Sequence, residues 1–126
     1  MIKVKWKTVI IGLVLAVILS AIIEGLITLL AGMIIGLFGG AIGFLIATIY
    51  VGYTVGGDYK NGAIHGALVG IFMGIIVGII GIILGVALAK SGVTTGLLAL
   101  LAIIIYVIIG SIGGIIGVLI KDRRST

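Results

Sequence analysis

The chain consists of long apolar stretches separated by very few polar positions. Between residues 8 and 120 only four side chains carry a formal charge, namely Glu24, Asp58, Lys60 and Lys90. A segment this apolar cannot form the surface of an ordinary water-soluble domain, in which about a quarter of the residues are charged. The pattern therefore indicates that the chain lies in a lipid bilayer.

The lengths of the apolar stretches predict the number of spans. A membrane-spanning helix needs about 20 apolar residues. Residues 8–55 are interrupted only by Glu24 and fit two spans, whereas residues 63–89 and 91–120 each fit one. We therefore predict a single transmembrane domain over residues 1–126 with four helices, at approximately residues 7–25, 29–55, 62–89 and 93–120.

Turn signals separate these spans. Residues 56–62 form a polar, glycine-bounded loop in which Asn61 is expected to cap the third helix. Lys90-Ser91-Gly92 is a minimal turn, and the first turn is expected near Glu24–Gly25, before Gly32. The fold class is therefore an all-α membrane protein with two antiparallel hairpins. A β-barrel would need alternating polarity, which runs such as residues 75–84 lack.

The positive charges predict the orientation. One side of the membrane would carry Lys3, Lys5, Lys7, Lys60, Lys121, Arg123 and Arg124, and the other only Lys90. This bias predicts a multi-pass protein of the cytoplasmic membrane with the termini and the 56–62 loop in the cytoplasm. The net charge of +5 then reflects contact with the lipid bilayer, so we expect no nucleic-acid partner.

Glycines recur at helical spacing in three of the four spans. The expected packing residues are Gly32, Gly36, Gly40 and Gly43 in the second span, Gly62, Gly66, Gly70, Gly74 and Gly78 in the third, and Gly110, Gly113, Gly114 and Gly117 in the fourth. Such ridges let helix backbones approach closely in lipid. Packing within one bundle and association with a second copy or a larger complex both remain open. Residues 36–46 and 110–120 also match at several positions, which hints at an internal duplication.

Few polar residues are candidates for chemistry. Glu24 either reaches the headgroups at the end of the first helix or is a proton- or cation-linked carboxylate inside the bundle, with Thr28 on the same face. His65 and Asp58 lie near the 56–62 loop, where a structural histidine is favoured over a pH sensor. Tyr106 lies deep in its span and needs a partner or a shallow register.

No catalytic constellation is visible, so we expect no enzyme. The chain has no cysteine, its one histidine has no second ligand nearby, and its glycine pairs lack the lysine of a phosphate loop. We therefore expect neither a metal site nor a cofactor.

The segment Gly56-Gly-Asp-Tyr-Lys-Asn-Gly-Ala-Ile-His-Gly-Ala-Leu-Val-Gly70 is the most distinctive part of the chain. Together with the Lys/Trp-rich start and the glycine-rich helices, it resembles a family of small archaeal membrane proteins of the methanogen type, classed as a domain of unknown function. The resemblance implies about four helices in a cytoplasmic membrane and no established activity. The chain departs from that family because it has no proline at the first turn.

Two functions follow from these patterns. The first is a non-enzymatic accessory or structural protein that self-associates or joins a larger membrane complex through its glycine ridges. The alternative is a small proton-coupled transporter or exporter that uses Glu24. A proton-carrying ring subunit is disfavoured because the second and fourth spans contain no carboxylate.

Overall fold

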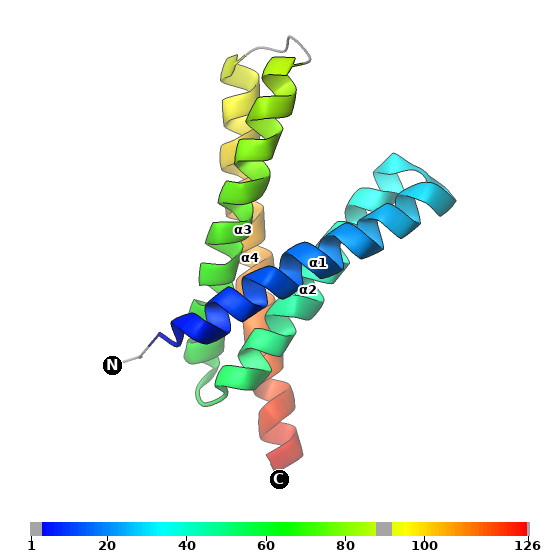
Figure 1. Cartoon of the computed structure of the whole chain (residues 1–126). Coiled ribbons are helices and arrows are strands. Elements are labelled where there is room, and N and C mark those ends of the chain that lie inside the picture. The colour runs from blue at the N-terminus through cyan, green and yellow to red at the C-terminus, as the bar shows by residue number, and fades with distance from the viewer. Residues whose placement is uncertain (1–3, 88–91, 126) are drawn as a thin grey trace.

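In the computed structural model the chain is described over residues 4–87 and 92–125, which form four helices and no strand (Figure 1). Each of these helices contains a stretch that is long and apolar enough to cross a membrane. The predicted all-helical chain with four apolar spans is therefore confirmed for the described residues. The four spans indicate a multi-pass membrane protein.

A single glycine joins the first two helices. α1 (Trp6–Ala31) and α2 (Met33–Val55) are separated only by Gly32, whose φ of 100° is a conformation that disfavours a side chain. The Gly32 amide donates to the Thr28 carbonyl and the Gly32 carbonyl accepts from the Gly36 amide, both at 3.0 Å. The chain can reverse within one residue because that residue has no Cβ.

The first helix is longer than the sequence analysis predicted. It continues to Ala31 instead of ending near residue 25, because the apolar pattern resumes directly after Gly25. A glycine inside a helix costs only about 1 kcal/mol, which does not stop it. Gly32 is consequently a turn residue and not a packing residue, since a Cβ added there would have no atom within 4 Å.

The loop before the third helix is also shorter than expected. α3 (Tyr59–Ala87) begins directly after Asp58, whose carbonyl accepts the amides of Asn61 and Gly62 at 2.9 and 3.3 Å. Asn61 was expected to cap α3, but its side chain instead donates to the Gly56 carbonyl at 3.0 Å. The loop is therefore limited to residues 56–58 and is tied to the end of α2.

α4 (Gly92–Ser125) is the longest helix and extends past the expected end at residue 120. Most of the turn predicted at Lys90–Gly92 falls on residues 88–91, which lie outside the described residues. In Figure 1, α1 runs beside α2 and α3 runs beside α4. The two pairs cross near the end that carries both termini and the α2–α3 loop, and they diverge toward the other end. We call the first of these the basic end.

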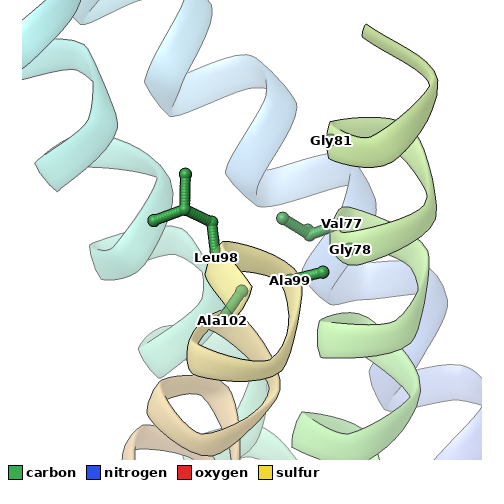
Figure 2. A pocket seen from close by; sticks show the side chains of 6 residues that line it. All are labelled: Val77, Gly78, Gly81, Leu98, Ala99 and Ala102. Carbon is green, nitrogen blue, oxygen red and sulfur yellow. The ribbon is translucent and has the colours of Figure 1, made fainter. Parts of the chain in front are cut away.

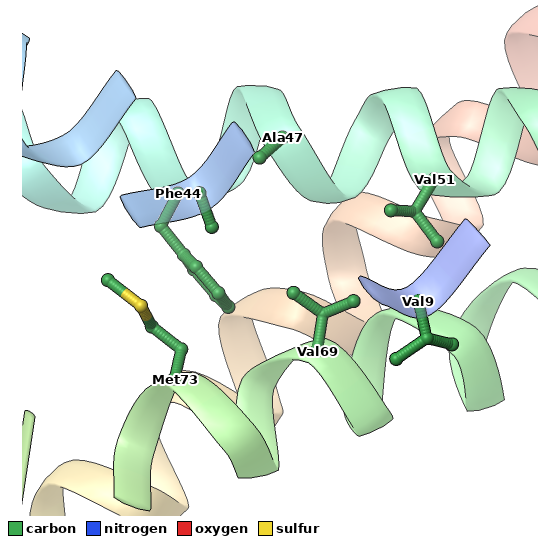
Figure 3. Packing of buried hydrophobic residues seen from close by; sticks show 7 residues of the cluster. Val9, Phe44, Ala47, Val51, Val69 and Met73 are labelled. Carbon is green, nitrogen blue, oxygen red and sulfur yellow. The ribbon is translucent and has the colours of Figure 1, made fainter. Parts of the chain in front are cut away.

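Buried apolar side chains fill the crossing of the two pairs. The cluster comprises Val9, Ala16, Phe44, Ala47, Val51, Val69 and Met73, which come from α1, α2 and α3 (Figure 3). Most of the remaining large apolar side chains are exposed, as lipid contact requires. Packing between the pairs is therefore concentrated near the basic end.

α3 and α4 touch along their glycines. A Cβ added at Gly62, Gly66 or Gly70 would overlap the backbone carbonyl of Gly114, Gly110 or Tyr106, respectively. As the residue number rises along α3, the number of the contacted residue on α4 falls. The two helices are therefore antiparallel, and their pairing keeps the same register over several turns. Backbones this close gain van der Waals and Cα–H···O contacts, which are the available attractions between helices in lipid.

We predict that Gly66→Ala destabilises the protein by about 1–3 kcal/mol, because the added methyl group forces α3 away from Gly110. The measurement is reversible unfolding in mixed micelles, followed by circular dichroism. Gly25→Ala is the matched control, since it lies inside a helix with no atom within 4 Å of the added Cβ. It should stabilise by about 0.5–1 kcal/mol, and equal unfolding midpoints for the two variants would contradict the close-contact argument.

Candidate functional site

Glu24 lies inside the first apolar span. The helix rises about 27 Å from Trp6 to Glu24 and continues for about 10 Å to Ala31. The apolar core of a bilayer is about 30 Å thick. α1 extends to Ala31, so Glu24 lies within a helix that is long and apolar enough to cross a membrane. Both alternatives for its carboxylate, at the headgroups or inside the bundle, stay predictions.

Three polar residues form a stripe on one face of α1. Ser20, Glu24 and Thr28 are spaced by four residues, and this face meets α2. The Ser20 hydroxyl is buried and donates to the Gly40 carbonyl at 3.0 Å. The half-buried Glu24 side chain reaches the same glycine, because a Cβ at Gly40 would lie 2.7 Å from Glu24 Oε2. Thr28 occupies the equivalent place beside Gly36.

The glycines of α2 therefore make room for polar side chains of α1. Any larger residue at position 40 would displace the carboxylate, and one at position 36 would displace the Thr28 hydroxyl. Gly36 and Gly40 were expected to bring two backbones together. Here they accommodate side chains, whereas Gly43 meets the backbone of Leu19 and Ser20.

An aromatic pair lies near this stripe. Phe44, one turn after Gly40, packs edge to face against Tyr106 of α4, with ring centroids 4.8 Å apart and planes at 88°. Tyr106 is half-buried. The deep tyrosine that needed a partner therefore packs against the Phe44 ring.

The Glu24 carboxylate has no pairing partner in the described part of the chain. No hydrogen bond or ion pair reaches it there, and no fully buried side-chain oxygen or nitrogen in that part lacks a partner. Its oxygens are therefore open to the surroundings of α1. An ionised carboxylate facing lipid costs roughly 2.5–3.5 kcal/mol on insertion scales and more in simulations. Ionisable residues inside membrane spans are for this reason candidates for a function.

His65 is the centre of a second polar group at the basic end. Its ring is fully buried, and Nε2 accepts the Lys5 backbone amide at 3.0 Å. Nδ1 lies 2.8 Å from the Asn61 carbonyl and must donate to it. These two bonds require the neutral ring with its proton on Nδ1. His65 therefore attaches the start of the chain to α3.

The same end joins α2 and α4. Lys121 of α4 lies over the Tyr53 ring, with Nζ 5.9 Å from the ring centroid, and its chain passes beside Gly56. Asp58 is exposed, and its side chain accepts the Lys60 amide at 3.4 Å. These contacts support the loop and helix ends, and none of them brings Asp58 to His65 or Glu24.

The remaining predicted glycines contact other helices of the same chain. Added Cβ atoms at Gly74 and Gly78 would meet Ile103 and Ala99 of α4, and those at Gly113 and Gly117 would meet Thr48 and Ile49 of α2.

The internal repeat of residues 36–46 and 110–120 is matched in part by the contacts of its glycines. Gly36 and Gly110 occupy equivalent positions, and each faces the helix that precedes its own, α1 for Gly36 and α3 for Gly110. Gly117 faces α2, however, whereas its counterpart Gly43 faces α1. The two halves therefore match only in part.

The described residues offer no cluster of three His, Cys, Asp or Glu side chains that could hold a metal ion. Sequence reasoning identified Glu24 and Thr28 but missed Ser20, which lies four residues before Glu24.

Four helices that are long and apolar enough to cross a membrane define a class, that of multi-pass membrane proteins. Residues 6–120 match the model of a family of unknown function, DUF5518, and the chain belongs to this family. Comparisons with curated proteins and with solved structures gave no significant match. The archaeal origin expected from the resemblance stays a prediction.

We predict that His65→Leu lowers stability by about 1–3 kcal/mol, because the Lys5 amide loses its acceptor, the buried His65 ring. Unfolding in mixed micelles measures the loss. A second protein lacking residues 1–5 provides the control, since it has no Lys5 amide to satisfy. His65→Leu should cost clearly less in that background. An equal cost in both backgrounds would show that the Lys5 bond does not stabilise the fold.

Proposed function

We propose that the protein is a non-enzymatic integral membrane protein that acts as a small proton-coupled transporter or exporter, with Glu24 as the group that takes and releases the proton. The observation that carries this proposal is the unpaired, half-buried carboxylate within the α1 span. Ionisable groups inside membrane spans are costly and are typical of proton and ion pathways.

The surroundings of Glu24 support reversible protonation. The protonated form is neutral and tolerates lipid, whereas the ionised form needs a cation beside it. A carboxylate in this position can therefore exchange one proton for one positive charge. Ser20, whose hydroxyl is held by Gly40, and Thr28 add two hydroxyl groups along the same face.

The arrangement of the helix pairs supports a moving site. α1 and α2 diverge from α3 and α4 beyond the crossing (Figure 1). Glu24 follows the last buried residue of α1, Ser20. A tilt of one pair against the other about the buried cluster would change which side of the membrane the carboxylate faces. We also propose that the basic end lies in the cytoplasm, because lysine and arginine are concentrated there. The test is Ser125→Cys, with a membrane-impermeant thiol reagent added to one side of the membrane at a time.

We predict that Glu24→Gln abolishes cation-driven proton movement. The experiment uses proteoliposomes with an acidic interior, an internal pH dye, and external Na⁺, K⁺ or tetraphenylphosphonium added in turn. At least one cation should raise the internal pH with the native chain and none with Glu24→Gln. Asp58→Asn is the matched control, because Asp58 is exposed at the basic end. Equal responses of the native chain and Glu24→Gln, or no response to any cation, would refute the proposal.

Self-association, alone or within a larger complex, is the second candidate, and a different observation favours it. Gly81 and Gly96 have no atom within 4 Å of an added Cβ. Gly81 lines an apolar groove of about 220 Å³ between α3 and α4, shared with Val77, Gly78, Leu98, Ala99 and Ala102 (Figure 2). Gly62, Gly66, Gly70, Gly74 and Gly78 all meet α4 of the same chain, so among the described glycines of the α3 ridge Gly81 is the one left open to a helix from outside.

We predict that Gly81→Leu disperses such an assembly without unfolding the chain, because the leucine would fill the groove and meet no backbone. Mass measurement in mild detergent and circular dichroism follow the two effects separately. Gly70→Leu serves as the contrast, since its side chain would collide with the Tyr106 backbone and destabilise the fold itself. An unchanged assembly mass with Gly81→Leu would exclude the groove as the contact.

A further inference from the structure

The charge at the Glu24 site limits what can bind there. Within the α1 span Glu24 is the only acidic residue, and no lysine or arginine lies between residues 8 and 59. The site therefore carries one negative charge when it is ionised, which matches a ligand with a single positive charge. A divalent cation would leave an uncompensated charge in the apolar layer, which is costly.

The site is poor in oxygen ligands. The Ser20 hydroxyl already donates a hydrogen bond to the Gly40 carbonyl. The carbonyls in the interior of each helix accept hydrogen bonds from amides of the same helix. Small inorganic cations such as Mg²⁺ and Ca²⁺ need about six or more oxygen ligands. With one carboxylate and the Ser20 and Thr28 hydroxyls, a bare metal ion could not replace its water shell here.

The walls of the site favour an apolar ligand with a diffuse charge. Ile23 and Ile27 flank Glu24 on α1 and lie against Gly39 of α2. The side chains around the carboxylate are therefore mainly apolar. A cation that carries its own apolar groups loses little hydration on entering such surroundings.

The route to the site runs through the bilayer. The Glu24 oxygens are not enclosed, and the neighbouring Ile22 and Leu26 are more than half exposed on α1, at 53% and 56%. The buried contacts of α1 lie at Val9, Gly12, Ala16 and Ser20, before the level of Glu24. A ligand dissolved among the acyl chains can therefore reach the carboxylate laterally.

We infer that the species exchanged against the proton at Glu24 is a lipophilic organic cation of charge +1, such as a quaternary ammonium or phosphonium ion. This inference rests on the proposed function and names its substrate class. On binding, the Glu24 carboxylic acid releases its proton to water and the resulting carboxylate pairs with the cation. No covalent bond other than O–H changes and no electron is transferred.

The titratable groups around this exchange are few. From α2 the residues beside Glu24 are Gly36 and Gly40, which have no side chain to titrate. Tyr106 of α4 interacts with Glu24 only electrostatically, because α1 and α4 are not packed against each other. α3 carries no titratable side chain between residues 66 and 84. The one proton displaced by the cation is therefore assigned to Glu24.

The test is binding of tetraphenylphosphonium to the full chain in mild detergent, measured by calorimetry in buffers of different ionisation enthalpy. We expect saturable binding with one proton released per cation and, where Glu24 is protonated in the free protein, an affinity that falls about tenfold per unit decrease in pH. Glu24→Gln should lose at least tenfold in affinity and release no proton. Asp58→Asn, which changes an exposed carboxylate at the basic end, should bind the cation like the native chain.

Each other outcome has a defined meaning, provided that circular dichroism shows each variant to be folded. Equal affinity for the native chain and Glu24→Gln would overturn the inference, because the probe would only be partitioning onto apolar surface. If the native chain does not bind the probe but exchanges protons for Na⁺ or K⁺ through Glu24 in proteoliposomes, the substrate class is wrong and the proposed function stands. If no cation moves protons through Glu24, the substrate class and the proposed function are both wrong.

Discussion

Close contact between helix backbones at glycine is the interaction on which the rest of this structure depends. In lipid there is no hydrophobic force between apolar helices, so attraction has to come from short-range contacts. α3 and α4 meet this condition at Gly62–Gly114 and Gly66–Gly110, where any side chain would overlap a backbone carbonyl. Gly113 and Gly117 extend the same kind of contact to α2. The three helices therefore share one rigid junction, against which α1 packs with Val9 and Ala16.

The same absence of side chains has a different effect between α1 and α2. There, Gly36 and Gly40 leave room for Thr28 and Glu24, so that polar groups fit between apolar helices without pushing them apart. The carboxylate gains space but no ion-pair partner among the described residues, and the proposed exchange of a proton for a cation depends on this unpaired state. The stability of the fold and the proposed chemistry thus use glycine for opposite purposes, close approach in one pair and open space in the other.

Polar contacts connect the two helix pairs at the basic end. His65, Asn61 and the Lys5 amide connect the start of the chain to α3 and to the end of α2, while Lys121 stacks on Tyr53. These contacts hold the end at which the two helix pairs cross. The opposite end has no comparable polar bonds between the pairs in the described residues, and the pairs diverge there (Figure 1). Relative motion of the pairs would therefore pivot at the basic end and be largest beyond Glu24.

The number of spans and the all-helical fold could be predicted from the sequence, because hydropathy is a local property that each segment carries by itself. The prediction was less accurate at Gly32 and Asp58, where a one-residue reversal and a shorter loop depend on backbone angles that composition does not specify. For Glu24 and the glycines, only the tertiary structure identifies the partner of each residue. The sequence pattern of a glycine ridge is the same whether the ridge contacts a backbone, a carboxylate or lipid. The contact depends on which face of the helix is turned toward which neighbouring helix. That choice is made by the packing of all four helices together and by no single segment.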